Sequence, residues 1–165
     1  MESLFRHIGD EEKVWIYQAD RPLTNQEAID LQKSGDAFIN SWAAHGKKLK
    51  AGVLVLHNLF VIIHVDEVQA KASGCSVDSS VHWMTDEGKK RGIDFFNRLN
   101  IVYLDEKEMP VLCSPEEFEA LAESGFVGSE TIVFNNMVYK GSELKTGWLC
   151  PAAQGWQSKF LPLAG

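Results

Sequence analysis

The chain has 165 residues and a mass of 18.5 kDa, and its 45% hydrophobic and 24% charged residues are typical of one globular domain. Its formal net charge of -7 at pH 7 argues against nucleic acid or an anionic membrane as the main partner, because both bind basic surfaces. The three cysteines, Cys75, Cys113 and Cys150, form neither an even set nor a Cys-x-x-Cys pair, so we expect reduced thiols and a bacterial-type cytoplasm.

Two further features bear on location. The N-terminal residues hold no basic segment followed by an apolar run, so we expect no signal peptide. The most apolar stretch, residues 51–65, is interrupted by His57, Asn58 and His64 and falls short of the roughly 20 apolar residues of a membrane helix. We therefore expect a cytoplasmic protein without a membrane partner.

The first two thirds of the chain predict the element order β-α-β-β-α-β. Thr24 and Glu27 form a capping box that begins the first helix, and Gly92 ends the second. Asp78 or Ser79 is a suitable N-cap for that second helix. We expect strands at residues 14–18, 52–56, 59–65 and 101–104, and helices at residues 25–44 and 79–91.

This order predicts an α+β fold with the ferredoxin-like βαββαβ arrangement, an antiparallel four-stranded sheet with both helices on one face. In the strand at residues 59–65, Phe60 and Ile62 point to one face while Val61, Ile63 and Val65 point to the other. A strand that is apolar on both faces is covered on both sides, so we expect it at the centre of the sheet.

The last third of the chain predicts a C-terminal α/β extension. Ser114, Pro115 and Glu117 are typical of a helix start, and residues 131–134 form an expected strand. The tail that follows is irregular and carries Trp148 and Trp156. We expect a single domain over residues 1–165, with a core at 1–105 and an extension at 106–165 that covers part of the bare sheet face.

Nucleotide and metal motifs are missing from the sequence. Gly46-Lys47-Lys48 and Gly88-Lys89-Lys90 lack the preceding glycine and the following hydroxyl residue of a phosphate-binding loop, so we expect no ATP hydrolysis. No Gly-x-Gly-x-x-Gly follows a strand. His57 and His64 lie seven residues apart along a strand, roughly 20 Å, so one ion cannot join them. We expect no metal and no cofactor.

The segment Ser73–Ser80 is the strongest candidate site. It follows the central strand and begins a helix, whose first backbone N–H groups favour an anion, and its hydroxyls add hydrogen-bond donors. The alternative is structural, because small residues make a tight turn and Ser or Asp caps a helix. The predicted ligand-binding residues are Ser73, Gly74, Cys75, Ser76, Asp78 and Ser79.

A second interpretation is a thiol enzyme or thiol sensor that uses Cys75, with His45 or His64 as the base. A thiol at a helix start has a lowered pKa, and Cys113 before the helix at Ser114 is expected to share this effect weakly. If Cys75 is instead buried among apolar groups, its pKa rises and it is inert. In the neighbouring segment, Trp42 is expected in the core and His45 as a cap at a helix C-terminus.

Four segments together resemble an uncharacterised bacterial protein family often labelled "ABC transporter ATPase". They are residues 14–18 (Val-Trp-Ile-Tyr-Gln), 42–46 (Trp-Ala-Ala-His-Gly), 73–78 (Ser-Gly-Cys-Ser-Val-Asp) and 131–136 (Thr-Ile-Val-Phe-Asn-Asn). The resemblance covers nearly the whole chain and implies no established activity, fold or catalytic residue. The family label implies ATP hydrolysis, which the missing phosphate-binding loop contradicts.

We therefore favour a ligand-binding or regulatory domain without catalytic activity, whose small anionic ligand or protein partner contacts the Ser73–Ser80 segment. The thiol function of Cys75 is one alternative. A structural protein–protein interaction domain, with the aromatic tail as its docking surface, is the other. The sequence leaves open whether the chain forms oligomers.

Overall fold

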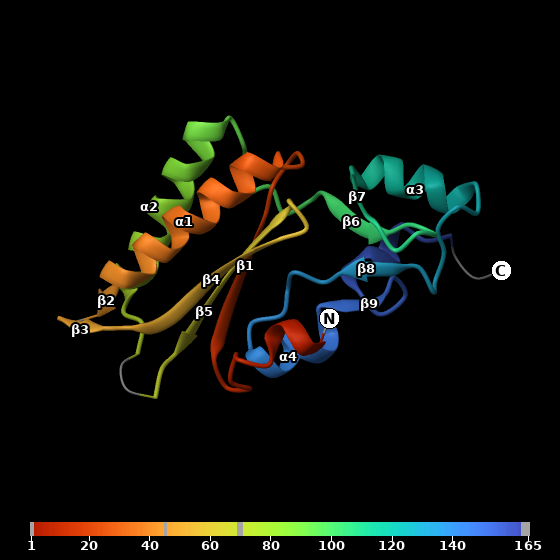
Figure 1. Ribbon diagram of the computed structural model, residues 1–165. Helices are drawn as coiled ribbons and strands as arrows, with labels where there is room; N and C mark the ends of the chain where they lie inside the picture. The colour runs from red at the N-terminus through yellow and green to blue at the C-terminus, as the bar shows by residue number, and fades with distance from the viewer. Residues whose placement is uncertain (1, 45, 69–70, 163–165) are drawn as a thin grey trace. The chain divides into compact units, whose positions relative to one another are not determined.

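The computed structural model describes residues 2–44, 46–68 and 71–162. The fold is mixed α+β, with four α-helices and several antiparallel sheets among those residues (Figure 1). The chain divides into two compact units. The first unit is Met1–Asn97 with Val138–Lys145, and the second is Arg98–Met137 with Thr146–Gly165.

The first unit is built on a three-stranded antiparallel sheet in the order β1-β5-β4. A second, two-stranded ribbon pairs β2 with β3. The elements of this unit are η1 (Glu2–Phe5), β1 (Lys13–Gln18), α1 (Asn25–Ser41), β2 (Ala43–Ala44), β3 (Lys47–Lys48), β4 (Lys50–Leu56), β5 (Phe60–Asp66), α2 (Gly74–Arg91) and most of α4 (Gly141–Gly147).

The expected start of the first helix and the expected end of the second are found, whereas the other two boundaries differ. The capping box of Thr24 and Glu27 begins α1, and Gly92 ends α2 in the left-handed conformation, at φ 62°. Helix α1 ends at Ser41 instead of residue 44, because the chain turns extended at Trp42 and enters β2. Helix α2 begins at Gly74 instead of residue 79, because its N-cap is Ser73 and not Asp78 or Ser79 as expected.

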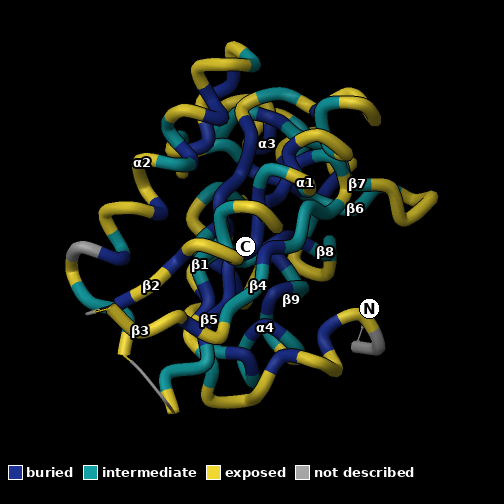
Figure 2. The backbone as a smooth tube through the Cα atoms, turned by 60° about the vertical axis from the view of Figure 1, so that its left-hand side comes forward, coloured by how far each residue is buried: buried dark blue, intermediate teal, exposed yellow. Residues whose placement is uncertain are grey.

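Strand β5 is central and buried on both faces, as its sequence predicts. Val61 and Ile63 share one core cluster with Leu31 of α1 and Met84 of α2, so both helices cover the same face of the sheet. Figure 1 shows α1 and α2 side by side against this sheet, and Figure 2 traces the buried strand in dark blue. Phe60, Ile62 and His64 point to the opposite face.

The expected fourth strand of this sheet lies elsewhere, so the four-stranded ferredoxin-like sheet is wrong. Residues 101–104 form β6 (Ile101–Leu104), which pairs with β7 (Pro110–Cys113) in a hairpin. The edge of β1 that a fourth strand would occupy is bonded instead by a later segment, where Val14 N–H donates to Tyr139 O at 2.9 Å. A hairpin closes over a short loop, which costs less chain entropy than returning to β1.

The second unit has its own antiparallel sheet, in the order β7-β6-β8-β9. Its other elements are α3 (Pro115–Glu123), β8 (Ile132–Phe134), β9 (Leu149–Pro151) and η2 (Trp156–Phe160). The capping box of Ser114 and Glu117 begins α3, as expected. Phe118 of α3 packs on Ile101 and Val133 of the sheet.

The boundary between the units differs from the predicted division at residue 105. Strand β6 belongs to the second unit, and Val138–Lys145 returns to the first. The C-terminal tryptophans pack inside the second unit, since Trp148 is 1% exposed against Phe134 and the half-buried Trp156 joins the Phe118 cluster. None of the described helices combines the length and the apolar character needed to cross a membrane.

Candidate functional site

The Ser73–Ser80 segment forms the first two turns of α2, and three of its serine hydroxyls bond within the protein. Ser73 Oγ accepts the Ser76 N–H at 3.2 Å. Ser76 Oγ donates to Ala43 O at 2.9 Å, and Ser80 Oγ donates to Val77 O at 2.6 Å. These hydrogen bonds cap the start of α2 and bind it to β2. They agree with the alternative that these serines have a structural role.

The segment at Trp42 meets this helix start. The indole Nε1–H of Trp42 donates to Ser76 O at 2.8 Å, and Trp42 is 3% exposed in the core, as expected. The two segments that the sequence singles out, around residue 42 and around residue 76, are therefore one packed junction. Its polar atoms satisfy each other, which a buried junction requires.

The other predicted site residues divide into two groups. Gly74, Asp78 and Ser79 are exposed on α2. His45 lies outside the described residues, and the Cys75 side chain also lies outside them, although its backbone belongs to α2. The anion site and the thiol function at this position therefore stay predictions.

The two other cysteines behave as buried thiols. Burial, with a smaller contribution from the Glu117 carboxylate, raises the pKa of Cys113 to about 11. Burial also raises the pKa of Cys150. The expected lowering of the Cys113 pKa is wrong, because the thiol packs into the core beneath α3 and desolvation outweighs the helix start.

A different group of residues forms the most developed polar site of the first unit. His64 Nδ1 lies 2.6 Å from Glu12 Oε2, and both side chains are nearly buried, at 10% and 12% exposed. The other carboxylate oxygen of Glu12 accepts the Gly9 N–H at 2.8 Å. The carboxylate is thus held on both sides, and it in turn orients the imidazole.

The protonation state of His64 follows from its surroundings. Burial lowers the pKa of His64 below its ordinary value of 6.5, and the opposing effect of Glu12 is smaller. At neutral pH the ring is therefore uncharged. A carboxylate can only accept, so Nδ1 carries the proton and Nε2 keeps a free lone pair. This is the arrangement of a hydrogen-bond acceptor or a general base.

Gly52 makes room for the imidazole. It lies directly opposite His64 in the pairing of β4 with β5. A Cβ atom at position 52 would stand 2.3 Å from His64 Nε2, much closer than atoms pack. The ring therefore lies across the glycine backbone, and any other residue at position 52 would push it away from Glu12.

The imidazole faces a pocket of about 430 Å³ at the outer edge of β4. His7 lies beside His64, with ring centroids 5.5 Å apart. Asp36 and Asn40 of α1, which covers the other face of the sheet, also line the pocket, and both are exposed to solvent. No described strand pairs with the outer edge of β4, so backbone groups of the strand also border this space. The pocket thus combines an acceptor nitrogen, a carboxylate and an amide.

The sequence suggested His64 as a base for Cys75 and excluded it as a metal ligand with His57. It gave no indication of Glu12. Glu12 and His64 are 52 positions apart and follow no spacing rule, so only the folded sheet brings them together. The one available signal was a glycine within an expected strand, whereas the register that places Gly52 opposite His64 is known only from the structure. A glycine inside a strand often marks a close approach by another group.

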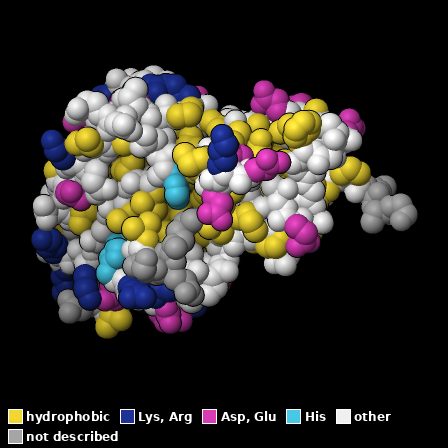
Figure 3. Space-filling model, turned by 45° about the vertical axis from the view of Figure 1, so that its right-hand side comes forward, with side chains coloured by type: hydrophobic (Ala, Val, Ile, Leu, Met, Phe, Trp, Pro, Cys, Tyr) yellow, Lys and Arg dark blue, Asp and Glu magenta, His cyan; other side chains and the backbone are white. Residues whose placement is uncertain are grey.

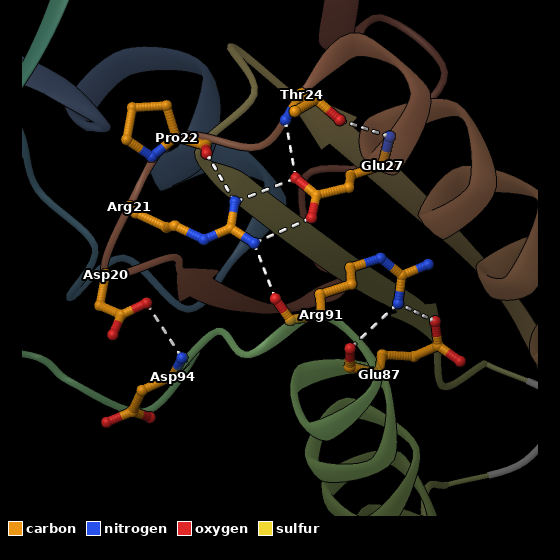
Figure 4. A network of polar contacts seen from close by, with 8 residues as sticks. All are labelled: Asp20, Arg21, Pro22, Thr24, Glu27, Glu87, Arg91 and Asp94. Carbon is orange, nitrogen blue, oxygen red and sulfur yellow. Dashed lines mark hydrogen bonds and ion pairs between the residues drawn. The ribbon is translucent and has the colours of Figure 1, made fainter.

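A second polar network joins the ends of α1 and α2 (Figure 4). Arg21 makes two bonds to the Glu27 carboxylate, at 2.8 and 3.0 Å, and this pairing lowers the pKa of Glu27 to about 2. Arg21 also donates to Arg91 O at 2.7 Å. Glu87, 2% exposed, accepts from Arg91 and Lys90. Each charge has a partner, so this network serves to fasten the helices.

Among the described residues, no three His, Cys, Asp or Glu side chains converge into a metal-binding group. Comparison with known proteins adds no guide to function: no family model, curated protein or solved structure matches the chain. The chemistry of the His64 pocket therefore stands on its own geometry.

Proposed function

We propose that the first unit is a ligand-binding domain whose site is the pocket between His64 and α1. The observation that carries this proposal is the orientation of His64, whose Nδ1 is bound to Glu12 at 2.6 Å while its ring borders a pocket of about 430 Å³. This proposal agrees with the ligand-binding function expected from the sequence. It places the site at the edge of β4 and not at the start of α2.

The groups of the pocket favour a small ligand that donates hydrogen bonds. His64 Nε2 accepts a hydrogen bond, and the Asp36 carboxylate and Asn40 amide face the same space. Asp36 adds negative charge, and Glu12 lies directly behind the imidazole. An amine or amidine fits this set better than the anion expected at the Ser73–Ser80 segment.

Ligand binding at His64 should depend on pH. When His64 takes up a proton, Nε2 becomes a donor and no longer accepts from the ligand. Ligand binding should therefore weaken as the solution becomes acidic enough to protonate the ring. Because burial lowers the pKa of His64, that weakening lies below the ordinary histidine range.

The test uses 1,4-diaminobutane and agmatine as cationic probes and inorganic phosphate as the anionic one. In NMR titrations of the full chain, the amines should shift the ring signals of His64 and the amide of Gly52, while phosphate should not. A ligand at about 100 times its dissociation constant adds roughly 2.7 kcal/mol of stability, visible as a raised melting temperature.

Two variants make the result specific. His64→Gln should abolish the amine-dependent shift in melting temperature, because it removes the oriented acceptor. His82→Gln is the matched control, since His82 is exposed on α2 and outside the pocket lining. Phosphate binding at the pocket, or amine binding that survives His64→Gln, would contradict the proposal.

The thiol function is the remaining alternative, and it depends on a side chain outside the described residues. His64, one of its two suggested bases, points to the sheet face opposite the one that carries α2, and it is engaged by Glu12. The alkylation experiment described in the Discussion tests this alternative separately.

A further inference from the structure

The second unit carries an apolar groove that the His64 pocket does not explain. The groove has a volume of about 550 Å³ and lies between the edge strand β7 and α3. Val111 and Cys113 of the strand, with Leu121 of the helix, give it apolar walls. Phe126 stands at its rim and is 81% exposed, a large apolar surface to leave in water.

The second unit, which carries this groove, is acidic. The second unit holds eight Asp and Glu residues against three Lys and Arg residues, so most of the net negative charge of the protein belongs to it. The acidic ones are Asp105, Glu106, Glu108, Glu116, Glu117, Glu119, Glu123 and Glu130. Figure 3 shows acidic side chains next to hydrophobic ones on the face it draws.

Glu117 connects the charge with the groove. It lines the groove directly, and one of its carboxylate oxygens accepts the Ser114 N–H at 2.7 Å as part of the capping box. The carboxylate is therefore held in place. A cationic group seated in the groove would meet a fixed negative charge beside apolar walls.

The strand edge adds a third feature. Strand β7 has four residues and ends the sheet order, and no described strand pairs with its outer side. An extended peptide can add to such an edge by main-chain hydrogen bonds. Its side chains alternate between two faces, so every second residue of the peptide would face the groove, where Glu117 lies beside the apolar walls.

From these three features we propose that the groove between β7 and α3 docks an extended partner segment whose groove-facing residues are both apolar and basic. The apolar residues pack against Leu121 and Phe126, and the basic ones pair with Glu117. The sequence suggested the aromatic tail as a surface for protein–protein interaction. This proposal places the interaction surface on β7 and α3 instead.

The test titrates the full chain with an acetylated and amidated octapeptide of two Lys-Lys-Val-Val repeats, so that each face of the extended peptide carries both residue types. The control for charge is the same peptide with glutamate in place of lysine. We expect saturable binding of the basic peptide, chemical shift changes at the amides of β7 and α3, and affinity that falls with added salt. The acidic peptide should not bind.

Two variants and their controls locate the site. Phe126→Ser should weaken binding about tenfold, whereas Val68→Ser, which changes another highly exposed apolar residue, should leave it unchanged. Glu117→Gln keeps the capping box and removes the charge, and it should weaken binding about threefold. Glu119→Gln removes an exposed charge of α3 outside the groove lining and is its control.

Each of four binding results would overturn the proposal. They are equal binding of the acidic peptide, shift changes away from β7 and α3, unchanged affinity in Phe126→Ser, and equal effects of Glu117→Gln and Glu119→Gln. Self-association of the protein that disappears in Phe126→Ser would also overturn it, because the groove would then be occupied by a second copy of the chain.

Discussion

Replacing Gly52 by alanine tests the packing of His64 directly. The new Cβ atom would stand 2.3 Å from His64 Nε2 and 2.9 Å from Cε1. Either the ring swings away and loses Glu12, or the strands separate. A hydrogen bond to a charged group is worth about 1.5–3 kcal/mol, and overpacking costs about 1–3 kcal/mol. We therefore expect Gly52→Ala to lower the free energy of unfolding of the first unit by about 2 kcal/mol.

A double-mutant cycle isolates this contact. In a His64→Ala background the ring is gone, so Gly52→Ala should cost nothing and should stabilise the strand by about 0.5 kcal/mol or more. The coupling energy between the two positions should accordingly be about 2–3 kcal/mol. Gly74→Ala is the matched control, because a Cβ atom there meets nothing within 4 Å.

Hydrogen exchange of the β5 amides, followed by NMR, is the appropriate assay, because it reports the opening of the strand that carries His64. The reasoning would be refuted if Gly52→Ala cost the same free energy with and without the His64 ring. It would also be refuted if the alanine variant kept the His64 ring signals and exchange rates of the unmodified protein.

Three further predictions concern titration and charge. Because the pKa of His64 is lowered on folding, the unfolded chain binds its proton more readily, so stability should fall as pH drops below about 6.5. His64→Gln should flatten that part of a thermal-unfolding profile. Glu87→Gln should destabilise the protein by about 2–3 kcal/mol in urea denaturation, because Arg91 loses its nearly buried counter-charge. Cys113, with a pKa of about 11, should resist alkylation at pH 7, as read by mass spectrometry. If Cys75 reacts no faster, the thiol function fails.

The sequence alone predicted the features that depend on near neighbours. The capping boxes at Thr24 and Ser114 span four residues each, and both begin helices. The central position of β5 followed from its apolar residues on both faces. These signals act over a few residues or along one strand, so no knowledge of distant contacts is needed to interpret them.

The start of α2 was predicted only in part from the sequence. The small polar residues from Ser73 to Ser80 indicated a helix start, but several of them suit the N-cap position equally well. The contact between Ser76 and Ala43 accompanies the choice of Ser73 as the cap. That contact joins segments 33 residues apart, so local preference could not distinguish among the candidates.

The candidate site itself was decided by tertiary structure. Sheet pairing brings His64 to Gly52, and the N-terminal segment brings Glu12 to His64, across 52 positions of sequence. The destination of β6 was also beyond the sequence, because its residues suit either sheet and the choice depends on which edge is occupied. Helix caps and strand patterns depend on interactions between residues close in sequence, so they can be predicted from the sequence directly. Pairing between distant segments depends on the competition of many such contacts for the same surfaces, and that competition is resolved only in the folded chain.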